Sequence, residues 1–167
     1  MKLVEEKSKF LREICPDFNF GDKNLNPKKI AEGMFKIMIE ENGLGLAAPQ
    51  IGETHRVFVM GLEGEEFICF NPEVLEESDE QELNEEGCLS FPGLYVKVKR
   101  PKKIKARYQD EKGEMHEREL EDLWARCFLH ELDHLNGIVF VDKVGKVALD
   151  LAKRRRKKYL RERSKNG

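Results

Sequence analysis

The order of the elements along the chain predicts an α+β fold. Residues 26–42 have the periodicity of a helix, short β-type runs follow, and a second helical stretch begins near residue 122. Because helices and strands are segregated along the chain, the strands are expected to form antiparallel sheets. The chain has 167 residues, of which 40% are hydrophobic. This is enough for one domain with one sizeable core.

The first helix is predicted by its start, its periodicity and its end. Asn26 is a favourable N-cap, and Pro27 occupies the first helical position. Apolar residues then recur at helical spacing: Ile30, Met34, Ile37 and Met38. Asn42-Gly43 is a typical C-terminal signal. We therefore expect an amphipathic helix between these signals.

The strands are predicted by short runs rich in β-branched and aromatic residues, separated by Gly, Pro and charged turns. The runs are 56–60, 66–70, 94–98, 103–108 and 115–120. Asp110–Gly113 is expected to form the hairpin turn before the last run. The segment 73–86 carries eight acidic residues and no basic residue, which predicts a solvated excursion rather than a packed segment.

The second helix is predicted to end at Asn136-Gly137 and contains His130-Glu131-Leu-Asp-His134. Side chains at positions i and i+4 project from the same face of a helix, so the two imidazoles can share a metal ion. Glu131 then stays free for proton transfer. An alternative is that both histidines are simply exposed, or satisfied within the core.

A catalytic metal site with two histidines needs a third protein ligand, and two cysteines are candidates. Cys127 lies seven residues before His134, about 10.5 Å along the axis, and is expected in the pocket or core. Cys88 follows Gly87 in a predicted loop, where glycine lets the backbone turn the thiolate toward another element. The alternative for Cys88 is a small buried residue.

A third motif is Gly43-Leu-Gly-Leu-Ala-Ala-Pro-Gln50. It superficially fits the Gly-x-Gly-x-x-Ala pattern of dinucleotide-binding loops. However, it follows a helix and precedes strands, which is the reverse of what that loop requires. The small residues instead predict a close backbone approach to a substrate or to the second helix, with the Gln50 amide as a hydrogen-bond donor.

Composition excludes several other classes. No apolar run exceeds four residues, which excludes a membrane-spanning helix and the apolar stretch of a secretory signal. The four cysteines are scattered and form no Cys-x-x-Cys, so free thiols or a metal ligand are expected rather than a disulfide scaffold. We therefore expect an intracellular protein in a reducing compartment.

The segments 43–50, 86–90 and 130–134 together resemble the three motifs of the peptide deformylase family, in the family's order and with similar spacing. The resemblance extends from about residue 10 to about residue 145. It implies antiparallel β-sheets packed around a central metal-binding helix, with an N-terminal helix and a basic C-terminal helix. It also implies a metal-dependent hydrolase that removes the formyl group, as formate, from the N-terminal formylmethionine of newly synthesised proteins.

The resemblance also implies roles for individual residues. Cys88, His130 and His134 would bind one Fe²⁺ per chain, for which Zn²⁺ or Ni²⁺ can substitute. Glu131 would be the general acid and base, with Gln50 and the Leu89 backbone N–H as the oxyanion hole. An ion pair between Glu86 and Arg100 would hold the cysteine loop. The expected substrate-binding residues, beside His130, are Gly43, Leu44, Gly45, Gly87, Leu123, Arg126 and Cys127.

The sequence departs from the family pattern in two places. Val4–Ser8 replaces the usual approach to Leu11-Arg12, which leaves the pairing of an N-terminal strand open. Trp124 and Leu129 stand where the family more often has a small residue and a glutamine. These two side chains are expected to change the pocket shape and the packing of the second helix.

Residues 1–150 are predicted to form a single catalytic metallohydrolase domain, and residues 151–167 a basic helical extension. The extension carries nine Lys or Arg residues and one acid, Glu162. Its weak apolar stripe consists of Leu149, Ala152, Tyr159 and Leu160. The extension is either a solvated helix or, as the resemblance suggests, a contact with ribosomal RNA.

Two other functions are alternatives to a deformylase that acts on N-formylmethionyl nascent peptides. A zincin-like metallopeptidase would need a further ligand downstream, and no histidine follows His134. An inactive ribosome-binding homologue would not need all the functional side chains intact. We expect a monomer without a membrane contact, in the bacterial cytoplasm, with an organelle left open.

Overall fold

The computed structural model describes residues 1–166, and side chains as far as Ser164. Its α-helices are α1 (Pro27–Glu40), α2 (Asp122–Leu135) and α3 (Lys146–Asn166). Its strands are β1 (Gly45–Ala47), β2 (Val57–Leu62), β3 (Glu65–Glu77), β4 (Gln81–Cys88), β5 (Phe91–Pro101), β6 (Lys103–Gln109) and β7 (Met115–Glu121). Short 3-10 turns lie at Lys9–Arg12, Ala48–Ile51 and Phe140–Lys143. The predicted order of helix, strands and helix is confirmed.

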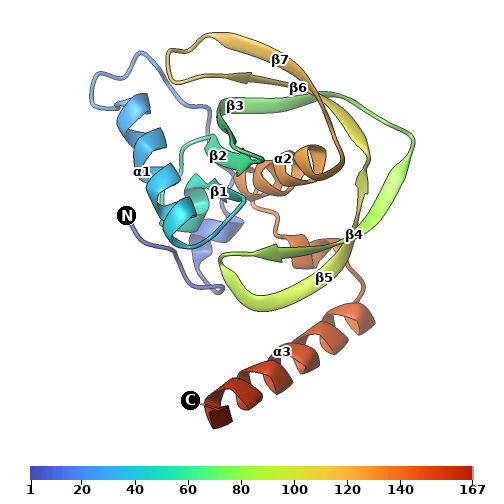
Figure 1. The fold of residues 1–167 in the computed structure, drawn as a ribbon. Coiled ribbons are helices and arrows are strands. Elements are labelled where there is room, and N and C mark those ends of the chain that lie inside the picture. The colour runs from blue at the N-terminus through green and yellow to red at the C-terminus, as the bar shows by residue number, and fades with distance from the viewer. Residues whose placement is uncertain (167) are drawn as a thin grey trace.

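The strands form two antiparallel sheets around α2. One sheet has five strands in the order β1-β2-β3-β6-β7, and β4 pairs with β5 in a separate hairpin. In Figure 1, α2 lies at the centre, with the curved larger sheet on one side and the β4–β5 hairpin on the other. The predicted α+β fold, with antiparallel sheets around a central helix, is confirmed.

The packing of β2 on both of its faces explains why residues 57–60 are all apolar. Val57 and Val59 belong to a cluster with Met34 and Met38 of α1, whereas Phe58 and Met60 belong to the cluster around α2. Successive side chains of a strand point to opposite faces, so a strand covered by a helix on each face needs apolar residues at every position. This packing holds β1, and the loop that follows it, against α2.

The acidic segment 73–86 is strand and not an excursion, so that prediction was wrong for the backbone. It forms the end of β3 and most of β4. Most of its carboxylates are exposed, and several lie opposite basic residues of the neighbouring strand, as in the pairs Glu73–Arg107 and Glu85–Lys97. Opposite charges across an antiparallel pair stabilise it, and this favours strand for a segment whose own composition does not.

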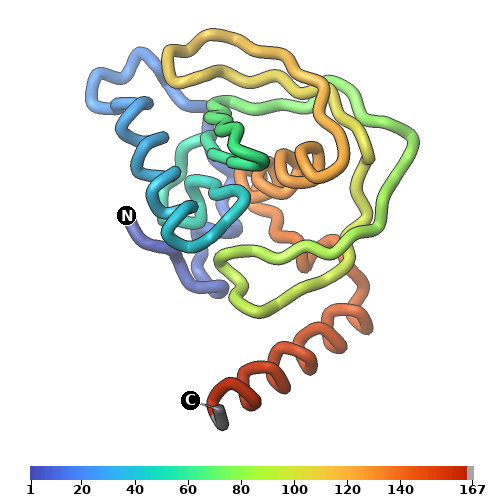
Figure 2. Tube along the Cα trace, in the orientation of Figure 1, coloured from blue at the N-terminus to red at the C-terminus, as the bar shows by residue number. Residues whose placement is uncertain are grey.

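Helix α3 begins at Lys146, before the boundary expected at residue 150, so that boundary falls inside the helix. Ala152 is only 2% exposed in a cluster with β5, and Arg156 Nη1 donates to Glu6 Oε2 at 2.8 Å. Tyr159 and Leu160, which the predicted stripe included, are half exposed. In Figure 2 the last turns of α3 extend away from the rest of the chain. The division into domain and extension stays a prediction.

The N-terminal segment forms no strand in the described residues. Its backbone is held by hydrogen bonds to other segments: the Val4 N–H donates to Gln50 O at 2.8 Å, and the Cys15 N–H donates to Leu135 O at 2.9 Å. None of the helices in the described part of the chain combines the length and apolar character of a membrane span.

Candidate active site

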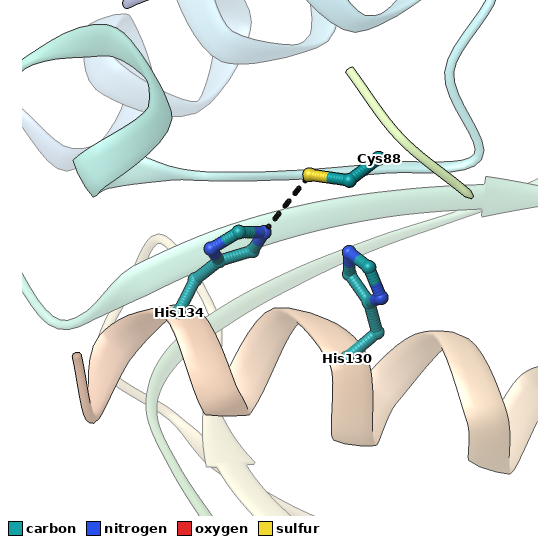
Figure 3. A group of neighbouring side chains, drawn as sticks. All are labelled: Cys88, His130 and His134. Carbon is teal, nitrogen blue, oxygen red and sulfur yellow. Dashed lines mark hydrogen bonds between the residues drawn. The ribbon is translucent and has the colours of Figure 1, made fainter. Parts of the chain in front are cut away.

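Three side chains that could bind a metal ion converge between α2 and β4 (Figure 3). Their donor atoms all lie within 4.8 Å of one another: Cys88 Sγ and one ring nitrogen each of His130 and His134. Cys88 Sγ lies 3.4 Å from His134 Nε2. A tetrahedral ion about 2.3 Å from sulfur and about 2.0 Å from nitrogen separates the two donors by about 3.5 Å. The donor set therefore fits a divalent metal.

Cys88 reaches this point because the β4–β5 pairing is irregular. Glu86 pairs with Val96, but Cys88 pairs with Phe91, so the register shifts at Gly87. A side chain at Gly87 would place its Cβ 2.6 Å from the Tyr95 ring. Gly87 therefore leaves room for the Tyr95 ring, and its φ lies outside the left-handed region that favours glycine.

Cys127, the other candidate ligand, is not part of this group. Its Sγ donates to Leu44 O at 3.6 Å, and burial raises the pKa of its thiol well above the ordinary value. The expectation of a pocket or core residue agrees with this position.

Gln50 is oriented by its own loop. Its Oε1 accepts a hydrogen bond from the Ala47 N–H at 2.8 Å, which points Nε2 toward Cys88 Sγ and Ser90 Oγ, each at 3.4 Å. The side chain is buried. Gln50 therefore presents N–H donors beside the candidate metal centre, as predicted, whereas the contact with Ser90 was missed.

Glu131 lines the same cavity as Gln50, and a glycine makes room for its carboxyl group. A Cβ at Gly45 would lie 2.4 Å from Glu131 Oε1, so the backbone of β1 passes directly beside the carboxyl group. Glu131 Oε2 is buried and has no hydrogen-bond partner among the described residues. Burial raises the pKa of this carboxyl to about 7. Such a group can accept and release a proton near neutral pH.

The predicted ion pair of Glu86 and Arg100 is present and forms part of a larger network. Arg100 Nε and Nη2 donate to the two oxygens of Glu86 at 2.8 and 3.0 Å. Glu86 also accepts from Arg126 Nη1 at 2.9 Å and lies 3.0 Å from His130 Nδ1. Burial raises the pKa of Glu86, but hydrogen bonds from His130 and Arg100 outweigh it and lower this pKa to about 2.

A cavity of about 520 Å³ opens at this centre. All of the expected substrate-binding residues line it: Gly43, Leu44, Gly45, Gly87, Leu123, Arg126 and Cys127. His130, Glu131, Gln50, Cys88 and Leu89 contribute to the same wall. Arg126 lines the cavity, but its guanidinium is committed to Glu86 and to the carbonyls of Val98 and Glu82.

Other lining residues were missed by the sequence analysis. Most belong to β5 and its approach: Phe91, Pro92, Gly93, Leu94 and Tyr95. The predicted run 94–98 includes Leu94 and Tyr95, whereas the observed strand begins three residues earlier, at Phe91.

A family model described as polypeptide deformylase matches residues 1–149. The chain belongs to this family. The peptide deformylase of Thermotoga neapolitana is 48% identical over 117 residues, which cover 70% of this chain and 71% of that protein. The peptide deformylase of Thermotoga maritima is 46% identical over 134 residues and 80% of each chain.

Solved deformylase structures share the fold. The crystal structure of the Thermotoga maritima peptide deformylase superposes with a TM-score of 0.82 at 42% identity, covering 86% of this chain and 97% of that one. The Synechococcus elongatus peptide deformylase in complex with actinonin gives a TM-score of 0.85 at 35% identity, covering 90% and 82%.

Peptide deformylases are metal-dependent hydrolases that remove the formyl group from N-formylmethionine, and this is the activity of the chain. The predictions of family, fold, activity and formylated nascent peptides as substrates are confirmed. Family membership favours this hydrolysis over the zincin-like alternative.

The two departures in α2 do not reach the deformylase cavity. Trp124 packs edge-on against Phe67, with ring centroids 4.9 Å apart, and Leu129 is buried in the same cluster. Neither residue lines the cavity. Trp124 and Leu129 therefore affect the packing of α2. The expected change in pocket shape is not supported by a contact of either side chain with the cavity.

Proposed function

We propose that the chain is an iron(II)-dependent peptide deformylase in which Cys88, His130 and His134 bind one ion per chain. The observation that carries this proposal is the convergence of one sulfur and two imidazole nitrogens beside a buried, unpaired carboxyl group. Thiolate and imidazole ligands suit iron, zinc and nickel, so Zn²⁺ or Ni²⁺ could substitute. A divalent ion held there would supply the Lewis acidity that makes water nucleophilic near neutral pH.

The protein's own groups then handle the proton and the developing charge. Glu131 takes the proton from the attacking water and delivers it to the amine that leaves, for which its raised pKa is suited. Gln50 Nε2 and the Leu89 backbone N–H donate hydrogen bonds to the oxyanion that forms from the formyl carbonyl. Gly43 supports this arrangement, because a Cβ there would lie 2.6 Å from Leu89 Cδ1.

The substrate methionine is proposed to occupy the cavity between β1, α2 and the β4–β5 hairpin. Leu44 and Leu123 provide half-exposed apolar side chains for it. The peptide backbone would bond along Gly45 or along residues 87–89, since an extended peptide pairs readily with an open strand edge.

The test is an anaerobic purification with metal analysis, followed by assays on a formyl-Met peptide and on the same peptide without the formyl group. We expect iron in about one equivalent, release of formate from the first peptide, and no cleavage of internal bonds in the second. Cleavage of internal peptide bonds would instead indicate a metallopeptidase.

We further propose a monomer in the bacterial cytoplasm, with an organelle as the alternative, that contacts ribosomal RNA through the exposed turns of α3. The support is the charge of these turns, where four basic side chains beyond Arg156 are exposed: Lys157, Lys158, Arg161 and Arg163. Such charges attract phosphate without reading sequence. Co-sedimentation with ribosomes at two salt concentrations tests the contact, and sedimentation velocity tests the monomer.

A further inference from the structure

Asp133 lies in α2 between His130 and His134 in the sequence, and it has no part in the proposed reaction. It is 9% exposed, and its Oδ2 accepts a hydrogen bond from Arg100 Nη1 at 2.6 Å. The other two donors of the Arg100 fork bind Glu86. Arg100 therefore joins a carboxylate of the helix to a carboxylate of β4.

The buried charges of this network cancel. Glu86 and Asp133 carry one negative charge each, and Arg100 and Arg126 carry one positive charge each; all four side chains are buried. Lys143 approaches Asp133 Oδ1 at 3.4 Å, but its side chain is 36% exposed and reaches water. An uncompensated charge in a buried site is costly, so each carboxylate is needed to balance an arginine.

Loss of the Asp133 charge would have two consequences at the metal ligands. The buried set would keep one excess positive charge beside the Glu86 carboxylate that contacts His130, and a positive charge near the site repels a divalent cation. Arg100 would also lose one of its two anchors, which loosens its hold on Glu86. Glu86 in turn sets the ring of His130 through Nδ1, and such partners orient metal-binding imidazoles.

We propose that Asp133 is a positioning residue of the metal centre. Through Arg100 it holds the Glu86–His130 pair, and its negative charge balances the second positive charge of the two buried arginines, Arg100 and Arg126. This inference rests on the proposed ligands Cys88, His130 and His134. It assigns Asp133 no contact with the substrate or the reacting atoms.

The test is zinc binding by the metal-free protein, measured by competition with a chelating dye. Asp133→Asn keeps the size of the side chain and removes its charge. We expect its affinity for Zn²⁺ to fall about 10- to 100-fold, the range typical for loss of a partner of a metal ligand. Circular dichroism and the melting temperature check that the variant folds.

The matched control is Asp142→Asn. Asp142 lies in the neighbouring 3-10 turn, pairs with Arg12 and accepts from the Val139 N–H, and it touches none of the four network residues. Its Zn²⁺ affinity should stay within twofold of that of the unmodified protein. The visible absorption of the Co²⁺-loaded protein adds a second readout, since altered ligand geometry shifts these bands in Asp133→Asn but not in the control.

Zinc affinity and a cobalt spectrum equal to those of the unmodified protein would overturn the role of Asp133. If Asp133→Asn does not fold, Asp133→Glu decides in its place. This variant keeps the charge but moves the carboxylate, so a loss of about threefold or more supports the proposal and unchanged affinity overturns it. If the unmodified protein itself fails to bind Zn²⁺, the proposed ligand set fails first, and the role of Asp133 falls with it.

Discussion

The surroundings of α2 and the outer half of α3 use charge in opposite ways. Around α2, Glu86, Asp133, Arg100 and Arg126 are buried and paired with one another. Along α3 beyond Arg156, the basic side chains are exposed and lie mostly without acidic partners, Glu162 near Lys158 being an exception within the described side chains. Buried ion pairs fix the positions of the side chains around α2, whereas exposed charges of one sign create a positive electrostatic potential along α3. Substitutions in the two regions should therefore affect different measurements.

The largest effect is expected at Glu131. Glu131→Gln removes the group that moves the proton but no metal ligand, so turnover of a formyl-Met peptide should fall by about 10²–10⁴-fold while the metal content is unchanged. The matched control is Glu85→Gln, because Glu85 lines the same cavity but is exposed and lies outside the group of candidate ligands. Turnover of Glu131→Gln within tenfold of the unmodified protein would contradict the assigned role.

The next effect is a difference in metal content between variants of the two cysteines near the site, Cys88 and Cys127. Cys88→Ser should lose most of its bound metal after dialysis, because a hydroxyl is a far weaker ligand than a thiolate. Cys127→Ser should keep its metal, since Cys127 contacts the Leu44 carbonyl and lies outside the donor group. Metal analysis of both proteins decides between these roles. Equal loss from the two variants would show that Cys88 has no special part.

The third effect is a difference in stability between two truncations of α3. Truncation after Asp150 removes buried Ala152 and the Arg156–Glu6 ion pair, and it should lower stability by about 1–2 kcal/mol and the melting temperature by about 2–8 °C. Truncation after Lys158 keeps both contacts and should leave the melting temperature within about 1 °C. Equal melting temperatures for the two truncations would mean that the inner turns of α3 add nothing to the stability of the body.

The smallest effect on the enzyme itself is expected from the exposed charges. Replacing Lys157, Lys158, Arg161 and Arg163 by Gln should leave turnover of a short formyl peptide within twofold. Ribosome binding should weaken and lose part of its salt dependence, because each lost phosphate contact lowers the slope of log K against log salt by about 0.7–0.9. Unchanged co-sedimentation at both salt concentrations would leave α3 as a solvated helix.

The sequence predicted those parts of the site that lie within continuous motifs. The spacing of His130 and His134 follows from helix geometry alone, and the Gly43–Gln50 motif carries its small residues in one run. Local reasoning named Cys88 and Cys127 as candidates for the third ligand, and the resemblance to a family then favoured Cys88. In the structure, Gln50 and Glu131 lie beside that donor group.

What the sequence did not predict depends on pairing between distant segments. Tyr95 of β5 lines the cavity next to Gly87 of β4, and the contact between Gln50 Nε2 and Ser90 Oγ joins residues 40 positions apart in the chain. Asp133 looks like any helical acid until the fold brings Arg100 to it across 33 positions. The strand character of 73–86 was missed for the same reason, because its charges are balanced by strands elsewhere in the chain.

The separation of the proposed metal ligands along the chain would link metal binding to folding. Cys88 and His134 are 46 positions apart, and the sulfur reaches the imidazoles only after the β4–β5 hairpin has closed against α2. The unfolded chain has no preformed site with all three donors, so the ion binds the native state preferentially. Its binding free energy then adds to stability, by about 4 kcal/mol at a free concentration a thousandfold above the dissociation constant. Loss of the ion would therefore reduce the lifetime of the folded chain as well as its turnover.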